Sequence, residues 1–378
     1  MAHFFKHQSK NTPPFKRNFL FLSLALGLCV GIFLLLNFFA YAKSRQAEYR
    51  SPQTLAQEKV STKNANQAVS LPVPKLDTVA YDRKLITLAN NPILSSTTDA
   101  STTVKNLWPP KTVYPKGGAI LPFKRVVAYY GNFYSKQMGA LGQYPPAEML
   151  DRLNQEVKRW ELADPETPVV PAIHYIAVTA QASAGADGKY RLRMPDEQID
   201  IAIDLARQNK GLVFLDLQVA LSNLQTEIPL LEKYFKMPQV HLGIDPEFSM
   251  KTGARPGTVI GTYDAVDINY ATNYLAQLVR ENNLPPKILV IHRFTQAMLT
   301  NYRQIKTRPE VQIVVHMDGW GSPAKKIGSY NYFVASEPVQ FTGFKIFYKN
   351  DLLAPSPRLI TPADLMKLTP RPIYIQYQ

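Results

Sequence analysis

Short apolar runs alternate with stretches of helical period from about residue 122 onward, and this rhythm restricts the fold more than any other feature. Eight strands are predicted, at residues 126–132, 169–177, 212–219, 240–248, 287–294, 311–319, 332–337 and 343–349. Helices are predicted between them, at residues 146–162, 196–210, 221–236, 265–283 and 295–305. Strands that are apolar on both faces and alternate with helices are typical of a parallel sheet built from βαβ units. Eight such strands in roughly 250 residues predict an α/β fold, a parallel (β/α)8 TIM-like barrel.

An open, doubly wound sheet is the alternative architecture for the same pattern. The dinucleotide-binding version of that fold carries a G-x-G-x-x-G motif directly after its first strand. No such motif follows residues 126–132. The sequence therefore favours the barrel.

Polar side chains stand near the carboxyl ends of most predicted strands, where barrel enzymes carry their active sites. Because side chains alternate along a strand, His241, Gly243, Asp245 and Glu247 are expected to share the face toward the barrel lumen. Carboxylates in an apolar interior are costly unless they are paired or functional, so the cluster indicates acid–base chemistry. The predicted catalytic residues are Glu247, Asp245, Asp216 and Asp318. The predicted substrate-binding residues are His174, Gln218, His292, His316, Tyr130 and Trp320.

A purely structural role is the alternative for each of these residues. An aspartate at the end of a strand can cap the next helix, and buried histidines and aromatic side chains can serve only to pack the core. The histidines His174, His241, His292 and His316 could include two metal ligands, and this alternative stays open. Because neither H-x-H nor H-E-x-x-H spacing occurs, the sequence favours a site without metal and without a cofactor. The only cysteine, Cys29, lies in an apolar segment near the N-terminus, so no disulfide or thiolate metal site is expected in the globular part.

The segment Asp245-Pro246-Glu247 resembles the end of the Asp-Gly-x-Asp-x-Asp-x-Glu motif of chitinase-type glycoside hydrolases. The resemblance implies that Glu247 is the general acid and that Asp245 orients the substrate. Three upstream positions differ, because Val240, His241 and Gly243 stand where that family has Asp, Gly and Asp.

A wider resemblance covers residues 126–378. The segments YYGNFYSKQMGALG, LDLQV, GIDPEFSM and GFKIFYKND are similar to those of a family of exported bacterial TIM-barrel proteins. This resemblance implies a fold and an export route, and it implies no particular activity.

Two functions follow from the predicted site. The first is hydrolysis of an extracellular glycan by paired carboxylates. The second is non-catalytic binding at the cell envelope by a barrel of the same glycosidase-like shape, since fold alone does not decide function. An open pocket lined by acids would favour the enzyme, and a rim plugged by side chains would favour the binding protein. No G-x-S-x-G motif or P-loop is present, so a serine triad and nucleotide chemistry are not expected.

Residues 18–42 contain no charged side chain and are long enough to cross a bilayer. The predicted organisation is a cytoplasmic tail at 1–17, a transmembrane anchor at 18–42, a flexible linker at 43–121 and the barrel domain at 122–378, outside the cell membrane. Two alternatives stay open. Ala40-Tyr41-Ala42 resembles a signal-peptidase site, and Cys29 is a candidate for lipidation; either would also export the domain.

The net charge of +14 is concentrated outside the predicted barrel. Residues 1–124 hold 16 basic and 5 acidic side chains, whereas residues 125–378 hold 27 and 24. A basic linker beside a membrane favours contact with anionic lipid, cell-wall glycan or another anionic polymer. A nucleic-acid partner is not expected, because no basic strand pair with interleaved aromatic residues and no reading helix is visible.

Overall fold

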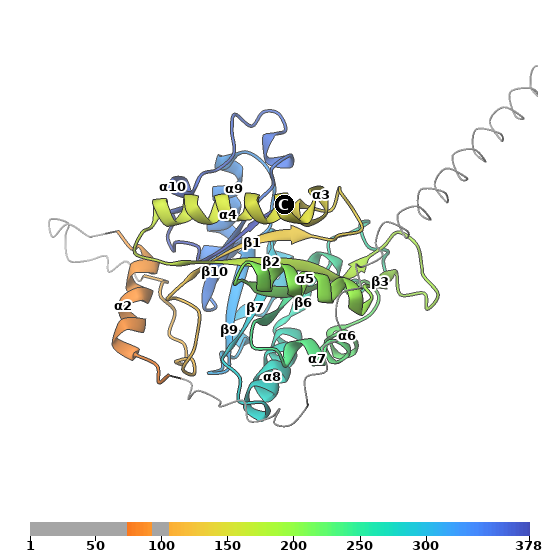
Figure 1. The fold of residues 1–378 in the computed structure, drawn as a ribbon, viewed down its shortest axis with the longest axis horizontal. Helices are drawn as coiled ribbons and strands as arrows, with labels where there is room; N and C mark the ends of the chain where they lie inside the picture. The colour runs from red at the N-terminus through yellow and green to blue at the C-terminus, as the bar shows by residue number, and fades with distance from the viewer. Residues whose placement is uncertain (1–73, 93–105) are drawn as a thin grey trace, which may run out of the picture. The chain divides into compact units, whose positions relative to one another are not determined.

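Eight parallel strands close into a barrel in the computed structural model, which describes residues 74–92 and 106–378 (Figure 1). The order around the barrel is β1 (Arg125–Gly131), β2 (Val169–Ala180), β4 (Leu212–Leu217), β5 (Val240–Ile244), β7 (Lys287–Arg293), β9 (Val311–Met317), β10 (Phe341–Ile346) and β11 (Tyr374–Tyr377). Pairing of β1 with both β2 and β11 closes the sheet. The predicted barrel is therefore confirmed, and the open doubly wound sheet is excluded.

Three short strands lie outside this ring. β3 (Arg191–Arg193) pairs antiparallel with the end of β2. β6 (Tyr263–Asp264) and β8 (Leu299–Thr300) form a separate two-stranded sheet. These strands extend the loops that follow barrel strands, and they leave the closed ring unchanged.

Helices cover the outside of the barrel and, in the case of α2 (Thr78–Ala89), the amino-terminal end of its lumen. The others are α3 (Ala140–Gln143), α4 (Pro146–Ala163), α5 (Asp196–Gln208), α6 (Leu224–Leu230), α7 (Glu232–Phe235), α8 (Ala265–Glu281), α9 (Pro323–Tyr330) and α10 (Pro362–Leu365). Short 3-10 turns occupy Pro246–Phe248, Gln296–Met298, Tyr302–Gln304 and Asn350–Leu352, and a π-helix occupies Asn331–Ala335. Local sequence sets the helix starts: α4 has a proline in its first turn, and α8 begins with a capping box made by Asp264 and Asp267.

The alternation of side chains along the strands produces two cores. Leu242, Ile244 and their counterparts on other strands face outward into the layer between barrel and helices. Phe214, Val290 and Val314 face inward and fill the lumen. Both sets are buried, which explains why the strands read as continuous apolar runs.

Helix α2 packs against the lumen core at the amino-terminal ends of the strands, within the segment predicted to be linker. Tyr81 and Leu88 of α2, together with Leu121, belong to the same apolar cluster as Val126 and Ile288 near the starts of β1 and β7. The helix is held in place by backbone contact, since the Arg371 N–H donates to the carbonyl of Leu88 at 2.8 Å. We call this end of the lumen, with α2 and Leu121, the barrel floor.

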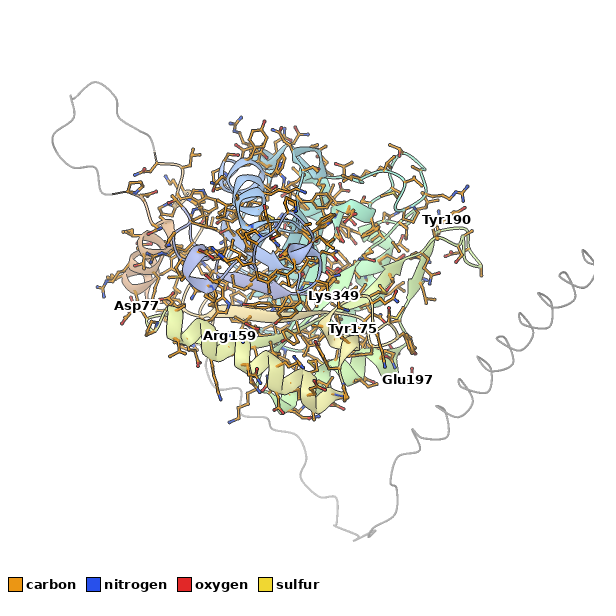
Figure 2. The ribbon with its side chains drawn as sticks, turned by 90° about the horizontal axis from the view of Figure 1, so that it is seen from above. Asp77, Arg159, Tyr175, Tyr190, Glu197 and Lys349 are labelled. Atoms are coloured by element: carbon orange, nitrogen blue, oxygen red, sulfur yellow. The ribbon has the colours of Figure 1, made fainter. Side chains whose placement is uncertain are left out.

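Figure 2 gives the view at 90°, with Asp77 at the start of α2 on one side of the molecule and Tyr190, in the loop between β2 and β3, on the opposite side. Asp77 caps α2, since its side chain accepts a hydrogen bond from Ala80 N at 2.9 Å. Residues 74–92 and 106–121 are thus part of the folded unit rather than a free spacer. The mixed apolar and polar composition of residues 71–91 indicated that this segment could pack locally, whereas residues 106–121 gave no such indication.

The strand predicted at 332–337 is wrong. This segment continues α9 into the π-helix, and Val334 and Ala335 are buried there. The four apolar residues at 332–335 are too few for their period to distinguish a strand from a buried helical turn. The eighth strand is instead β11, the four residues Tyr374–Tyr377 close to the end of the chain.

The helix predicted at 295–305 is also wrong, and Arg293 gives a physical reason. Its guanidinium donates to the carbonyls of Gln296 and Leu299 at 3.0 and 3.2 Å, and these carbonyls are therefore engaged outside an α-helical ladder. Asn301 adopts a left-handed backbone with φ of 55°, which ends any helical run. The predicted helix at 221–236 is present as two shorter helices, α6 and α7, with Pro229 inside the first.

No helix within residues 74–92 and 106–378 is both long and apolar enough to cross a membrane. The predicted anchor at 18–42 and Cys29 lie outside the residues that the structure describes.

Replacement of Leu88 by alanine tests whether α2 contributes to stability. Leu88 is 7% exposed and packs on the barrel floor, so Leu88→Ala should lower the free energy of unfolding of the full-length chain by about 2–4 kcal/mol. Ile86 on the same helix is 68% exposed, and Ile86→Ala should change it by less than about 0.5 kcal/mol. Denaturant titration measures both variants. Equal effects would mean that α2 is not docked.

Candidate functional site

The lumen becomes polar toward the carboxyl ends of the strands. Its inward positions there carry Tyr130 on β1, His174 on β2, Asp216 on β4, His292 on β7, His316 on β9, Lys345 on β10, and Tyr374 and Gln376 on β11. Nearly all of these side chains are fully buried. Because a buried polar group without partners is costly, their contacts with one another decide whether this end of the barrel is stable.

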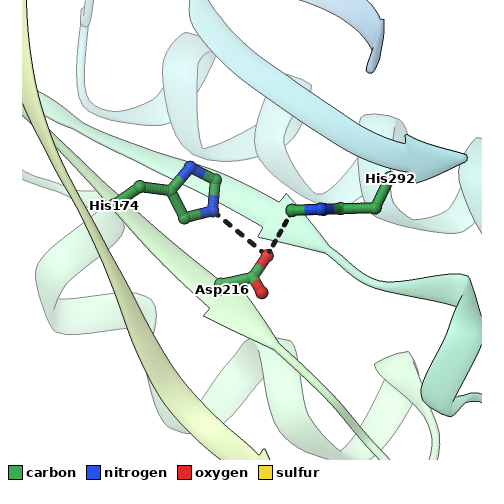
Figure 3. A group of neighbouring side chains, drawn as sticks. All are labelled: His174, Asp216 and His292. Carbon is green, nitrogen blue, oxygen red and sulfur yellow. Dashed lines mark ion pairs between the residues drawn. The ribbon is translucent and has the colours of Figure 1, made fainter. Parts of the chain in front are cut away.

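The Asp216 carboxylate is the centre of the cluster (Figure 3). His174 and His292 point toward it from two other strands, with their Nε2 atoms 3.2 and 3.3 Å from Asp216 Oδ1. The second oxygen, Oδ2, accepts a hydrogen bond from the Tyr130 hydroxyl at 3.0 Å. The side chains of His174, Asp216 and His292 are fully buried.

The Nδ1 atoms of His292 and His174, on the side of each ring away from Asp216, also have partners. His292 Nδ1 lies 2.7 Å from Asp318 Oδ2, and the other oxygen of Asp318 lies 2.8 Å from Lys345 Nζ. His174 Nδ1 lies 2.5 Å from the hydroxyl of Tyr374. Charges and hydrogen bonds therefore link β2, β4, β7, β9, β10 and β11 in one network.

The network separates the protonation behaviour of its members. Burial favours the neutral form of His292, but the carboxylates of Asp216 and Asp318 outweigh it and raise its pKa to about 10. Burial lowers the pKa of His174 to about 4, although Asp216 acts in the opposite direction. The pKa of Asp318 lies below its usual value, because Lys345 and His292 overcome the effect of burial. The pKa of Asp216 is likewise lowered, against burial, by His292 and His174.

A pocket of about 480 Å³ opens above this network at the carboxyl ends of the strands. Its lining includes Tyr130, Gln218, Asp245, Glu247, Phe248, Phe294, Asp318, Trp320, Lys345 and Phe347. The pocket is thus open and lined by acids, which is the feature expected of an enzyme rather than of a plugged rim.

Asp245 and Glu247 enter the pocket through the 3-10 turn that follows β5. Asp245 caps this turn, since its Oδ1 accepts a hydrogen bond from Glu247 N at 3.0 Å. Oxygens of Asp245 and Asp318 and a ring nitrogen of His292 all lie within 4.8 Å of one another. Burial raises the pKa of Asp245 well above its usual value. Burial and the nearby Asp318 carboxylate raise the pKa of Glu247.

The predicted site residues divide into two levels. Tyr130, Gln218, Asp245, Glu247, Asp318 and Trp320 line the pocket. His174, Asp216, His292 and His316 lie beneath it without solvent exposure. Asp216, predicted to be catalytic, is fully buried and is not among the residues that line the pocket. His316 has no hydrogen-bond partner for either ring nitrogen among the described residues.

Three residues of the site were not identified from the sequence. Lys345 lies on a predicted strand, but the alternation of side chains along that strand did not show whether Lys345 faces the lumen or the solvent. Tyr374 and Gln376 lie on β11, which no pattern predicted. The alternation in Tyr-Ile-Gln-Tyr was the available signal, and four residues are too short for a period to be convincing.

Gly243 makes room for the cluster. A Cβ atom at this position would lie 2.4 Å from both Asp216 Oδ1 and His174 Nε2, far inside contact distance. Only glycine therefore allows β5 to pass beside the two side chains.

No protein-family model matches the chain, and no curated protein matches it significantly. Among solved structures the chain is similar to dihydropteroate synthase from Burkholderia cenocepacia, in a crystal structure complexed with 7,8-dihydropteroate. The identity is 11% and the TM-score 0.30, over 68% of this chain and 86% of that one. A likeness at this level carries no argument, so the barrel assignment rests on the pairing of the strands.

Gly243→Ala tests the packing of the cluster. The added methyl group forces Asp216 or His174 to move, so we expect a loss of about 1–3 kcal/mol in the free energy of unfolding. Gly328 in α9 is the matched control, because a Cβ there meets no described heavy atom within 4 Å. Gly328→Ala should be neutral or stabilising by up to about 1 kcal/mol. Similar stability for the two variants in denaturant titrations would contradict the packing described.

Proposed function

We propose that the barrel hydrolyses glycosidic bonds in a glycan outside the cell membrane, with Glu247 as proton donor and Asp318 as its carboxylate partner. The observation that carries this proposal is the open pocket at the carboxyl ends of the strands, into which both side chains project together with Asp245. Glycoside hydrolysis needs an acid that protonates the leaving oxygen and a second carboxylate that activates water or stabilises positive charge on the sugar.

The surroundings of the carboxylates support different roles for them. Asp318 contacts Lys345 Nζ and His292 Nδ1, two groups that stabilise a carboxylate and fix its position. Glu247 forms no ion pair with a described residue. Burial and the Asp318 carboxylate raise its pKa against the opposing charges of Lys345 and His292. A partly buried carboxyl group with a raised pKa suits a group that carries a proton to a substrate. Asp245 holds the backbone of Glu247 through its hydrogen bond and so orients the donor.

The walls of the pocket favour a sugar as ligand. Trp320 is 48% exposed at the rim, and Phe248, Phe294 and Phe347 lie along the walls. Aromatic faces bind the apolar faces of sugar rings, while the acids and Gln218 offer partners to hydroxyl groups.

Glu247→Gln tests the proton donor. The full-length chain in detergent is incubated with purified cell wall and with a panel of polysaccharides, and new reducing ends are counted. The amide keeps the shape of the side chain but supplies no acidic proton, so release should fall by about 100-fold or more. Release by the native chain should also decline at high pH, as Glu247 loses its proton.

Glu281→Gln is the matched control, because Glu281 is exposed on α8 and is not among the residues that line the pocket. This variant should release reducing ends at the native rate. Unchanged release by Glu247→Gln would show that another group is the acid. Binding of cell wall without release by the native chain would instead support the non-catalytic envelope-binding function.

We also propose that residues 18–42 anchor the barrel to the cell membrane with the barrel outside. The support is the absence of charge over these residues and the basic side chains Lys6, Lys10, Lys16 and Arg17 before them. The native chain should stay in the membrane fraction after alkaline extraction, and a chain that lacks residues 1–42 should be released. An N-terminus that begins after Ala42 in the mature protein would show that the segment is cleaved instead.

A further inference from the structure

We propose that His174, Asp216 and His292 bind a divalent transition-metal ion of the Zn²⁺ class beneath the pocket. The proposal concerns the buried cluster and is independent of the hydrolysis proposed above. The ligand atoms would be the two Nε2 atoms and Asp216 Oδ1, one each from β2, β7 and β4. Sequence spacing gave no sign of such a site, because the three residues are 42 and 76 positions apart along the chain.

The three candidate ligand atoms converge without bonding to one another. Both nitrogens are close to Asp216 Oδ1, yet neither contact has the geometry of a hydrogen bond. All three atoms are fully buried and find no hydrogen-bond partner among the described residues. A buried polar atom that stays unpaired destabilises the fold. A single cation among them would satisfy all three at once.

The spacing of the atoms fits a tetrahedral metal. Zinc bonds to imidazole nitrogen and carboxylate oxygen are about 2.0–2.2 Å long, which at a tetrahedral angle separates neighbouring ligand atoms by about 3.3–3.5 Å. The observed separations from Asp216 Oδ1 are 3.2 Å to His174 Nε2 and 3.3 Å to His292 Nε2. These two separations already match a tetrahedral ion, and the two Nε2 atoms lie within 4.8 Å of each other.

Each ligand also has the outer partner that metal-bound side chains have. His292 gives its Nδ1 proton to Asp318 at 2.7 Å, the carboxylate–histidine arrangement found behind many metal ligands. His174 Nδ1 meets the Tyr374 hydroxyl, and Asp216 Oδ2 accepts from the Tyr130 hydroxyl. These three contacts engage the atoms on the far side of each residue, and the two Nε2 atoms and Asp216 Oδ1 therefore stay directed at one another.

The bonding of His292 shows why a cation belongs there. Asp318 is an acceptor, so the proton of a neutral His292 lies on Nδ1, and Nε2 then presents a lone pair to the Asp216 carboxylate. Two lone pairs 3.3 Å apart repel unless a positive charge lies between them. The alternative is a second proton on His292 Nε2. This N–H would not have the angle of a hydrogen bond to Asp216 Oδ1, and it would leave His174 Nε2 without a partner among the described residues.

The type of ligand decides the class of ion. Two imidazoles and one carboxylate suit Zn²⁺ and its first-row neighbours, whereas Mg²⁺ and Ca²⁺ prefer oxygen ligands. Three protein ligands would leave a coordination position for water or for an oxygen of a bound molecule. The glycine at 243 keeps the space beside Asp216 Oδ1 and His174 Nε2 free of a side chain.

The test measures metal rather than catalysis. The full-length, untagged chain is stripped with a chelator and dialysed against Zn²⁺, and bound metal is counted by mass spectrometry. We expect about one Zn²⁺ per chain, no uptake of Mg²⁺, and a higher unfolding temperature with Zn²⁺ than without it. Co²⁺ in place of Zn²⁺ should give the strong visible absorption of a tetrahedral ion.

His174→Ala and His292→Ala should abolish this uptake. Tyr374→Phe removes only the outer partner of His174 and should weaken Zn²⁺ binding by about 10–100-fold, which gives a result even if the histidine variants do not fold. His241→Ala is the control for a buried histidine outside the cluster, because its Nδ1 accepts a hydrogen bond from Ile288 N at 3.1 Å. A double replacement of His3 and His7 controls for the N-terminal histidines. Both controls should bind one Zn²⁺.

Failure of the stripped native chain to take up Zn²⁺ or Co²⁺ would overturn the proposal and assign the space to a proton. Uptake that Tyr374→Phe and the histidine variants leave unchanged would overturn it as well. Neither readout involves a glycan, so a failed hydrolysis assay and a failed metal assay remain distinct results.

Discussion

A carboxylate without any solvent contact, Asp216, sets the terms on which this barrel can fold. Burial of an unpaired charge is prohibitive, so positive charge and hydrogen-bond donors must reach it from other strands. Tyr130 on β1 donates a hydrogen bond to Asp216 Oδ2. The Nε2 atoms of His174 on β2 and His292 on β7 lie 3.2 and 3.3 Å from Asp216 Oδ1, where a proton or a metal ion can supply positive charge. This requires that the strands keep their register, because a slip by one residue would turn each of these side chains out of the lumen. The polar cluster therefore favours one register of the strands, and that register in turn positions the side chains of the cluster.

The lumen divides into two halves with different tasks. At the amino-terminal ends of the strands it is filled by apolar side chains and covered by α2, and this half supplies stability through burial. At the carboxyl ends it carries the charged network and the pocket. Because the polar groups are concentrated at one end, the apolar core elsewhere is continuous. The free-energy cost of burying polar groups is therefore confined to the carboxyl ends of the strands.

The network also ties the two proposals together physically. His292 contacts Asp216 on its inner side and Asp318 on its outer side, and Asp318 faces the pocket. Whatever positive charge lies at the inner side of His292, a proton or a metal ion, acts through the imidazole on the carboxylate that would meet a substrate. Lys345 completes the balance from β10, with its ammonium 3.9 Å from the centre of the Tyr130 ring. Ion pairs and hydrogen bonds thus hold the side chains beneath the pocket without any ligand.

The sequence by itself determined the class of fold and the inward positions of the central strands. Period-two alternation predicted that Asp216, Asp245, His316 and Asp318 face the lumen, because the pleat of a strand leaves only two faces. It did not reveal β11, Lys345 or the docking of α2, since a four-residue strand and a single lysine have too little local pattern. The convergence of His174, Asp216 and His292 was decided only by the tertiary structure. Closure of the sheet brings three strands distant in the chain to face one another across one lumen, and no spacing within the sequence encodes that distance.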